Sequence, residues 1–430
     1  MRNGWTILAV FLSFGWCAHA QPRATVVAAY TLPRISLSQM GNPDCDEPAL
    51  ARAKTNGLKF TDLPSIGSGL AAAGTNEFWG ITDRGPNGIA NDGENGLRTF
   101  PLPQFCPAIF RVRLTGNEIQ ILQTISLVDS QGKRISGLSN LKGEERLFES
   151  PDAKTPIAYD EDGVDPEAIR VLPDGKFLLS EEYSPSILVV GRDGQVLMRY
   201  TPTSKPLPRA TYPVKAILPE VFAQRRDNKG FENLALSGDG KFAYALLQAP
   251  MGDVNEPRYQ SSRVIRAVKL DVSNPLQAKV VGEYLALTSR ASDYSKSHGQ
   301  DKISWSDADW IAPEKLLVIE RGKGLVKLLL IDFSEATDIL GDPQEAKLVF
   351  EDSTTDLGKL KVQPATAREI FSTREVPGIT SDKIEGLVVL SPTELALSND
   401  NDFGIGENKN GDPSRIWIVR LAAPLPLKMK

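Results

Sequence analysis

The chain has 430 residues, of which 41% are hydrophobic and 24% are charged, and its formal net charge is −5. These values are typical of a globular protein with a large core. They exclude the strongly basic character that binding to nucleic acid or to an anionic membrane surface needs, so we expect neither partner.

The N-terminus has the pattern of an export signal. Arg2 supplies positive charge, the stretch from Trp5 to Cys17 is almost entirely apolar, and Ala18-His19-Ala20 has the small residues of a cleavage site. We therefore predict a signal peptide over residues 1–20 and one exported domain over 21–430, periplasmic or secreted and monomeric. No later apolar run is long enough to span a membrane.

The predicted mature chain holds two cysteines, Cys45 and Cys106, in irregular Pro-rich stretches. In an oxidising compartment a disulfide between them is the natural prediction, and free thiols are the alternative. The same region of chain has a single histidine, His298, which excludes zinc sites built from several histidines. Walker-type and dinucleotide-binding glycine motifs are absent as well, so we expect no organic cofactor.

A repeated hairpin pattern is the most informative feature of the sequence. Each copy has a short apolar strand, a turn with Gly, Pro, Asp or Asn, and a second apolar strand. The copies are 68–83, which is the loosest, then 166–181, 231–246, 305–320 and 384–399. Helices are scarce, and the best candidate is 215–226.

Each hairpin is followed by further apolar stretches that we predict as third and fourth strands. These are 108–114 and 119–127, 186–194 and 196–202, 264–270 and 280–287, 325–333 and 346–352, and finally 415–421 alone. The last unit lacks one strand, and the isolated N-terminal stretch 24–32 could supply it.

This organisation predicts an all-β fold, a β-propeller with about five four-stranded blades in which the N-terminal strand closes the ring. A sixth blade could lie in 128–160 or 352–380, which we otherwise interpret as loops. Two stacked β-sandwiches are the rival architecture, but they explain neither the repeat nor the N-terminal strand.

Acidic residues recur at equivalent positions of the repeats. Glu167, Glu232 and Glu385 share one register near the start of the first strand, and we expect them to line the central channel. Carboxylates gathered around a channel favour a cation, and Ca²⁺ suits irregular oxygen ligands best. The candidate ligands at the second-strand tips are Asp83, Glu181, Glu320, Asn399, Asp400 and Asp402. Turn capping and ion pairing are the alternative roles.

Basic residues accompany these acids. Arg84 follows Asp83 and Arg321 follows Glu320, while Lys229, Lys302 and Lys383 precede first strands. Arginine binds phosphate or carboxylate through two hydrogen bonds, so these cations could hold an anionic ester. Ion pairing with neighbouring acids is the alternative.

Several motifs resemble the phytase-like family of exported bacterial proteins, also described as "esterase-like activity of phytase". They are "FWGITDRGPNG", "DPEAIRVLPDGKFLLSEEYSPSI", "GFENLALSGDGKFAYALLQAP" and "IEGLVVLSPTELALSNDNDFG", and the resemblance spans about residues 60–421. It implies a β-propeller and a hydrolase of esters or phosphoesters. One departure is Leu246-Leu247-Gln248, where a second-strand tip has no acid, so a metal there would be held from one side of the ring.

Two functions are therefore open. One is a metal-assisted hydrolase of small anionic esters or phosphoesters, with Asp83, Glu181 and Glu182 as ligands or general base and with Arg84 and Arg321 binding the anion. The other is a non-catalytic propeller that binds a sugar, a peptide or a cell-envelope partner, with structural Ca²⁺. Its candidate aromatic residues are Trp79, Tyr183, Trp305 and Trp310.

Overall fold

The computed structural model describes residues 22–90, 96–142, 145–294, 299–406 and 408–427. The predicted signal peptide and His298 lie outside these residues. Among the helices in the described ranges, none is both long and apolar enough to cross a membrane.

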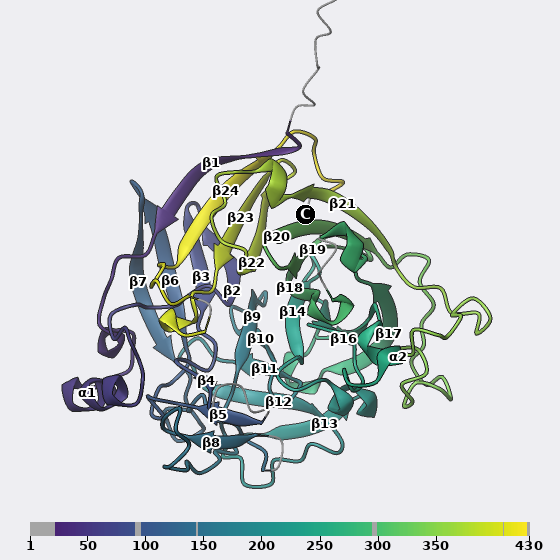
Figure 1. Ribbon diagram of the computed structural model, residues 1–430. Helices are drawn as coiled ribbons and strands as arrows, with labels where there is room; N and C mark the ends of the chain where they lie inside the picture. The colour runs from purple at the N-terminus through teal and green to yellow at the C-terminus, as the bar shows by residue number, and fades with distance from the viewer. Residues whose placement is uncertain (1–21, 91–95, 143–144, 295–298, 407, 428–430) are drawn as a thin grey trace, which may run out of the picture.

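The described residues form a β-propeller of antiparallel sheets arranged around one axis (Figure 1). The first sheet comprises β2 (Gly69–Gly74), β3 (Glu77–Ile81), β6 (Ala108–Thr115) and β7 (Glu118–Ser126). The second comprises β9 (Pro166–Val171), β10 (Phe177–Glu181), β11 (Ser186–Val190), β12 (Val196–Pro202) and an outer parallel strand, β13 (Val214–Leu218).

The remaining sheets repeat this order from the axis outward. The third comprises β14 (Phe231–Leu236), β15 (Phe242–Leu247), β16 (Val264–Asp271) and β17 (Lys279–Leu287). The fourth comprises β18 (Ser304–Ala312), β19 (Lys315–Gly322), β20 (Leu325–Asp332) and β21 (Thr366–Ser372). The fifth comprises β22 (Ile384–Ser391), β23 (Glu394–Asn399), β24 (Arg415–Leu421) and β1 (Ala24–Thr31).

The ring is closed at two levels. The inner strands β2, β9, β14, β18 and β22 contact one another in that order, and β22 returns to β2. At the outside, β1 pairs with β24 from Ala24 opposite Leu421 to Thr31 opposite Arg415. The predicted propeller with an N-terminal closing strand is therefore confirmed.

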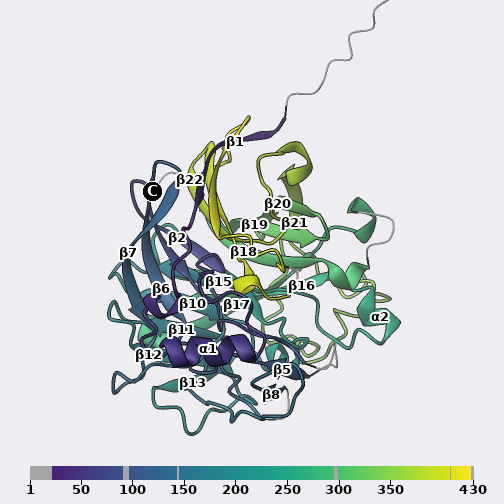
Figure 2. The same ribbon diagram turned by 60° about the vertical axis from the view of Figure 1, so that its left-hand side comes forward.

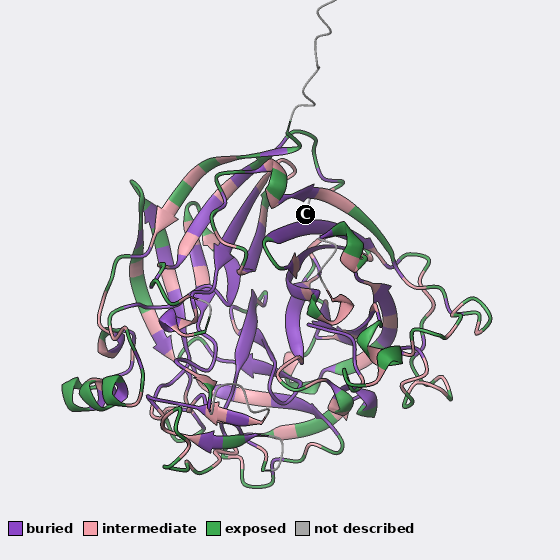
Figure 3. Ribbon diagram, in the orientation of Figure 1, coloured by how far each residue is buried: buried purple, intermediate pink, exposed green. Residues whose placement is uncertain are grey.

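The hydrophobic core is divided among the spaces between neighbouring blades. One cluster joins Ile81 and Ile109 of the first blade to Phe177 and Leu188 of the second, and four similar clusters fill the other junctions. Figure 3 accordingly shows inner strands that are largely buried, except toward the ends of β2 and β22, and outer strands with exposed faces.

Arg170 of β9 bridges the inner strands of three blades. Its guanidinium donates to the carbonyl oxygen of Leu70 at 2.8 Å and to Asp307 Oδ1 at 2.7 Å, so it links three blades. Arg170 lies on the same strand as Glu167, three residues further along the chain.

Two strand-level predictions were wrong. The fourth strand of the fourth blade is β21, whereas 346–352 is irregular: Phe350 packs in a satellite cluster and Glu351 pairs with the buried Arg266. Instead of a helix over 215–226, the chain forms β13 and a 3-10 turn at Glu220–Gln224, because Pro219 interrupts the segment.

The remaining helices and strands lie outside the five blades, and the turned view in Figure 2 shows α1 in front of them. They are the helices α1 (Glu47–Thr55) and α2 (Pro257–Gln260) and a small sheet of β4 (Gly88–Ile89), β5 (Leu97–Thr99) and β8 (Arg146–Phe148). The short β8 lies within the predicted loop 128–160.

Candidate functional site

A cavity of about 1490 Å³ opens at the end of the channel where inner strands begin and second strands end. Its lining is rich in charge of both signs. The acidic lining residues are Asp83, Asp165, Glu167, Glu182, Glu232, Glu385, Asp400 and Asp402, with Asp382 and Asp412. The basic ones are Arg84, Arg98, Lys229, Lys302, Arg321, Lys323, Lys383, Lys409 and Arg415.

Three inner-strand glutamates converge on this cavity because each is the extra residue of a β-bulge. In β9, β14 and β22 the pairing with the second strand skips Glu167, Glu232 and Glu385. A bulge redirects the side chain it carries, here toward the axis. Carboxylate oxygens of the three residues lie within 4.8 Å of one another, so the structure brings together the predicted channel-lining set.

The equivalent positions in the first and fourth blades hold Gly69 and Ser306. A Cβ on Gly69 would lie 2.7 Å from the Cα of Ala168, so β2 can approach β9 only with glycine there. The acids of the ring therefore come from three blades.

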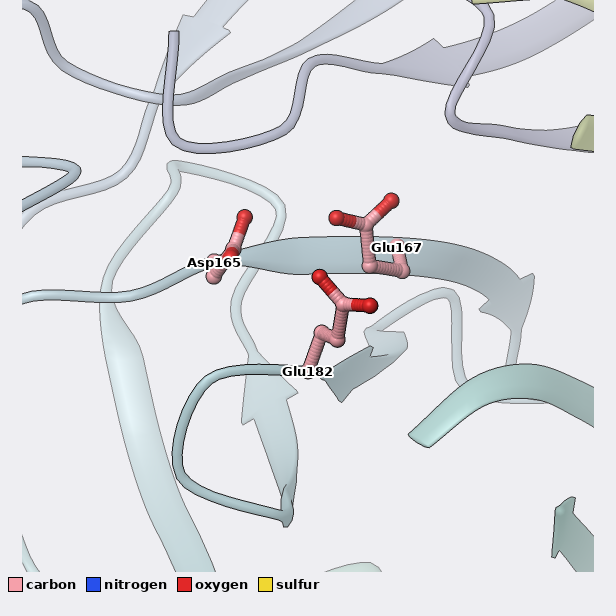
Figure 4. A group of neighbouring side chains, drawn as sticks. All are labelled: Asp165, Glu167 and Glu182. Atoms are coloured by element: carbon pink, nitrogen blue, oxygen red, sulfur yellow. The ribbon is translucent and has the colours of Figure 1, made fainter. Parts of the chain in front are cut away.

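A second group of acids shares Glu167. Oxygens of Asp165, Glu167 and Glu182 also lie within 4.8 Å of one another (Figure 4). Asp165 stands two residues before Glu167 and so shares its face of the extended chain, while Glu182 directly follows β10. All three are buried.

Some buried oxygens of cavity-lining residues lack any hydrogen-bond partner among the described residues. They are Glu182 Oε1, Glu232 Oε2 and, on the cavity-lining Gln248, Oε1. Burial, followed by the charge of Glu232, raises the pKa of both Glu167 and Glu182 well above its ordinary value. Anionic and amide oxygens with no donor are the pattern expected where a cation binds.

Arg84 lines the cavity, but its guanidinium is engaged by other residues of the protein. Its Nε donates to Asp165 Oδ2 at 2.6 Å, its Nη1 to Glu145 Oε2 at 3.1 Å and its Nη2 to Asn228 Oδ1 at 3.0 Å. The guanidinium also lies over the ring of Tyr183, 5.0 Å from its centroid. Each guanidinium nitrogen thus has a protein partner, so the contacts favour a role for Arg84 in positioning acids over that of an anion clamp.

Arg321 is less completely engaged. Its Nη2 lies 2.8 Å from Glu385 Oε1 and 3.4 Å from Glu232 Oε1, and its side chain is 13% exposed. It therefore links two acids of the ring while part of its guanidinium faces the cavity.

Lys383 occupies the side of the cavity formed by the fifth blade. Its ammonium donates to Asp400 Oδ2 and Asp402 Oδ1. Burial alone would raise the pKa of Asp400, but the Lys383 charge and hydrogen bonds lower it to about 2. Two predicted metal ligands, Asp400 and Asp402, thus surround a protein ammonium.

Asp83 lines the cavity and is influenced by the charges of both Asp400 and Asp165. Its Oδ1 accepts from the N–H of Gly85 at 2.8 Å. Burial first, and then the charges of Asp400 and Asp165, raise the pKa of Asp83 well above its ordinary value.

The side-chain oxygens of three other predicted metal ligands are engaged by groups of the protein. Glu181 is 3.0 Å from Arg199 Nη2 and also accepts from Ser184 N at 2.9 Å, whereas Glu320 accepts from Trp305 Nε1, Tyr294 Oη and Ser289 N, each at 2.8 Å. Both are fully buried away from the cavity lining. Asn399 lines the cavity, but its Oδ1 accepts from the N–H of Arg415 at 2.7 Å.

The four aromatic residues considered as a binding platform lie elsewhere. Trp305 and Tyr183 are buried, Trp79 packs edge-on against Phe177, and Trp310 packs at a blade junction. The cavity lining that the structure describes contains no aromatic side chain.

The predicted disulfide is absent, because Cys45 and Cys106 are both free and buried. The loop is held in another way. Asn42 Oδ1 accepts from the N–H of Cys106 at 2.6 Å, and its Nδ2 donates to the carbonyl oxygen of Cys106 at 3.1 Å. The Asn42 side chain thus links the two irregular stretches that hold the cysteines.

Sequence reasoning missed Asp165, Glu145 and Gln248. The first had a readable signal, because Asp165 precedes Glu167 by two residues in an extended segment. Glu145 lies in an irregular segment, and Gln248 was noted only as a departure from the acidic pattern.

Known proteins provide an independent comparison. A relative from Arthroderma benhamiae, called an uncharacterized secreted protein, is 28% identical over 238 residues, which are 47% of this chain and 45% of the relative. The chain thus matches less than half of that relative's length.

Solved structures with a similar course of chain are distant. The PQQ-bound aldose sugar dehydrogenase of Streptomyces coelicolor is 11% identical, with coverage of 93% and 99% and a TM-score of 0.35. The periplasmic gluconolactonase of Pseudomonas aeruginosa is 10% identical, with coverage of 84% and 86% and a TM-score of 0.30. At the level of families, the model described as "Phytase-like: Esterase-like activity of phytase" matches residues 65–403, and the chain therefore belongs to the phytase-like family.

Proposed function

We propose that this protein is an exported, metal-assisted hydrolase of small anionic esters or phosphoesters. The observation that carries the proposal is the overlap of two buried carboxylate groups at Glu167, beside the unpartnered oxygens of Glu182 and Glu232. Membership of the phytase-like family supports the reaction class. The name of the Arthroderma benhamiae relative, a secreted protein, supports the export.

The donor set fits a hard divalent cation. Asp165, Glu167, Glu182 and Glu232 would supply carboxylate oxygens and Gln248 an amide oxygen, a mixture that favours Ca²⁺. Such an ion, when bound, polarises an ester or phosphoryl oxygen and makes water a better nucleophile.

The remaining roles fall to residues of the chain itself. Arg84 keeps Asp165 in place through its Nε and its backbone N–H. Arg321 and Lys383 present positive charge to an anionic substrate from the opposite side of the cavity. Asp83 is suited to hold and donate a proton, because burial and the neighbouring charges of Asp400 and Asp165 raise its pKa above the ordinary value.

Hydrolysis assays test this proposal directly. Purified residues 22–430 would be incubated with p-nitrophenyl phosphate and short acyl esters, with Ca²⁺ and with a chelator. We expect turnover that disappears in the chelator and in Glu182→Gln, while circular dichroism shows an intact fold. The matched control is Glu394→Gln, since Glu394 pairs with Arg420 on the protein surface.

The opposite outcome is equally clear. Absence of turnover across the panel, or turnover unaffected by both the chelator and Glu182→Gln, contradicts the proposal. The first result would favour the non-catalytic binding protein.

A further inference from the structure

Lys383 is the centre of a second charged group, separate from the acids around Asp165. It stands directly before β22, and the two carboxylates that it contacts, those of Asp400 and Asp402, follow β23. Glu385 Oε1 lies 3.7 Å from the same ammonium. One lysine nitrogen is therefore surrounded by three carboxylates.

The surrounding chain fixes these carboxylates in place. Asp400 Oδ1 accepts from the Ser65 hydroxyl and, at 3.1 Å, from the N–H of Asp402. Asp402 and Phe403 have φ angles of 50° and 51°, a conformation that costs free energy for residues other than glycine. The buried ring of Phe403, edge-on to Phe105, holds the turn in that conformation.

The ammonium retains one uncommitted donor. A lysine ammonium carries three N–H groups. Two donate to Asp400 and Asp402, and at 3.7 Å the Glu385 oxygen is too far for a hydrogen bond, with no further acceptor among the described residues. The Lys383 side chain is 33% exposed and lines the cavity, whereas that of Asp400 is 2% exposed.

We propose that Lys383 takes the place that a second divalent ion holds in two-metal hydrolases, and that its third N–H contacts an anionic oxygen of the substrate. The contact between Lys383 and the substrate rests on the proposed function. The claim that the Lys383 ammonium occupies the place of a second divalent ion does not depend on hydrolysis. The cavity accordingly binds one divalent ion, near Glu167, and carries its second positive centre within the chain.

Counting the bound ions tests whether Lys383 takes the place of a second divalent ion. Wild-type residues 22–430, Lys383→Met and Lys383→Arg would be titrated with Ca²⁺ by calorimetry, and ions per chain counted by native mass spectrometry. Lys279→Met, on the exposed start of β17, is the matched control. We expect Lys383→Met to bind one more Ca²⁺ than the wild type, and the arginine and control variants to bind the wild-type number.

Phosphate binding tests the second half. Without divalent ions, we expect inorganic phosphate to bind Lys383→Met at least about tenfold more weakly than the wild type, a difference of about 1.4 kcal/mol. If the methionine variant does not fold, Lys383→Gln removes the same charge and can still hydrogen-bond to Asp400. Melting curves of both variants show which of them is folded, and the binding measurements use the folded one.

The outcomes separate this inference from the proposed function. If Lys383→Met or Lys383→Gln binds the same number of Ca²⁺ ions as the wild type, Lys383 does not replace a second ion. If phosphate binds the wild type and the variant equally, or binds neither detectably, Lys383 does not contact the anion. An extra ion in the variant combined with no turnover by the wild type would refute the hydrolase and support the ion replacement.

Discussion

Arg84 binds both oxygens of the Asp165 carboxylate, with Nε 2.6 Å from Oδ2 and the backbone N–H 3.1 Å from Oδ1. The same guanidinium reaches Glu145, and the three side chains are between 0% and 3% exposed. A cation that sequence reasoning assigned to the substrate thus fixes the position of a candidate metal ligand.

Replacement of Arg84 by methionine should strongly destabilise the protein. Asp165 and Glu145 would lose a buried partner, so we expect the free energy of unfolding to fall by about 3–5 kcal/mol in urea titrations at pH 7. Arg113→Met is the control, because Arg113 is 50% exposed and pairs with Glu77 at the surface. We expect it to cost about 0–1 kcal/mol. Equal losses in the two variants contradict the assigned role.

Glu320→Gln should affect folding and leave ion binding unchanged. Glu320 accepts hydrogen bonds from Trp305, Tyr294 and Ser289, and a glutamine has a single acceptor oxygen for these donors. We expect a loss of about 1–3 kcal/mol in chemical denaturation. Calorimetric titration of Glu320→Gln should give the wild-type affinity for Ca²⁺. A weaker affinity would indicate that Glu320 is a metal ligand and would contradict this prediction.

Without divalent ions, stability should fall as the pH rises. Burial and, after it, the charges of neighbouring acids raise the pKa of Glu167 and Glu182. Burial also raises the pKa of Glu385 from 4.5 to about 8, although the charges of Arg321 and Lys383 oppose the increase. Between the unfolded pKa of 4.5 and the folded pKa of about 8, the folded chain binds more protons than the unfolded chain. The contribution of these acids to the free energy of unfolding is therefore fully present below about pH 4.5 and is lost as the pH rises toward about 8.

Melting temperatures in chelator from pH 5 to pH 8 measure this loss. Ca²⁺ should reduce it, because the ion replaces the protons that relieve the acids. A melting temperature that is independent of pH, or equally pH-dependent with Ca²⁺, contradicts this description of the acids.

Reduction should leave the stability unchanged, because Cys45 and Cys106 are free in the structure. Thiol titration of the unfolded 22–430 chain should detect both residues, and the melting temperature should be the same with and without a reducing agent. A lower melting temperature after reduction would show that a disulfide forms in solution.

The sequence predicted the propeller because the repeated hairpins and the unpaired first strand are properties of local pattern. The same comparison of repeats found Glu167, Glu232 and Glu385, since equivalent positions become neighbours around a ring. These predictions needed only the period of the repeat and the direction of the strands.

The errors have a geometric cause. Successive side chains of a strand point to opposite faces, so a choice that is wrong by one residue selects the wrong side. Glu181 meets Arg199 in the interior while Glu182 lines the cavity, and Glu320 and Arg321 differ in the same way. Asp165 precedes the repeat, so the alignment of hairpins could not identify it.

The central claim is that buried acids sharing Glu167 bind a divalent cation. Calorimetric titration of Ca²⁺ into the wild type, Glu167→Gln and the surface control Glu394→Gln at pH 7 tests it most directly. The account predicts one ion in the wild type and the control, and an affinity lower by roughly a hundredfold or more in Glu167→Gln, with the fold intact. No binding by the wild type, or equal affinity in Glu167→Gln, would contradict it.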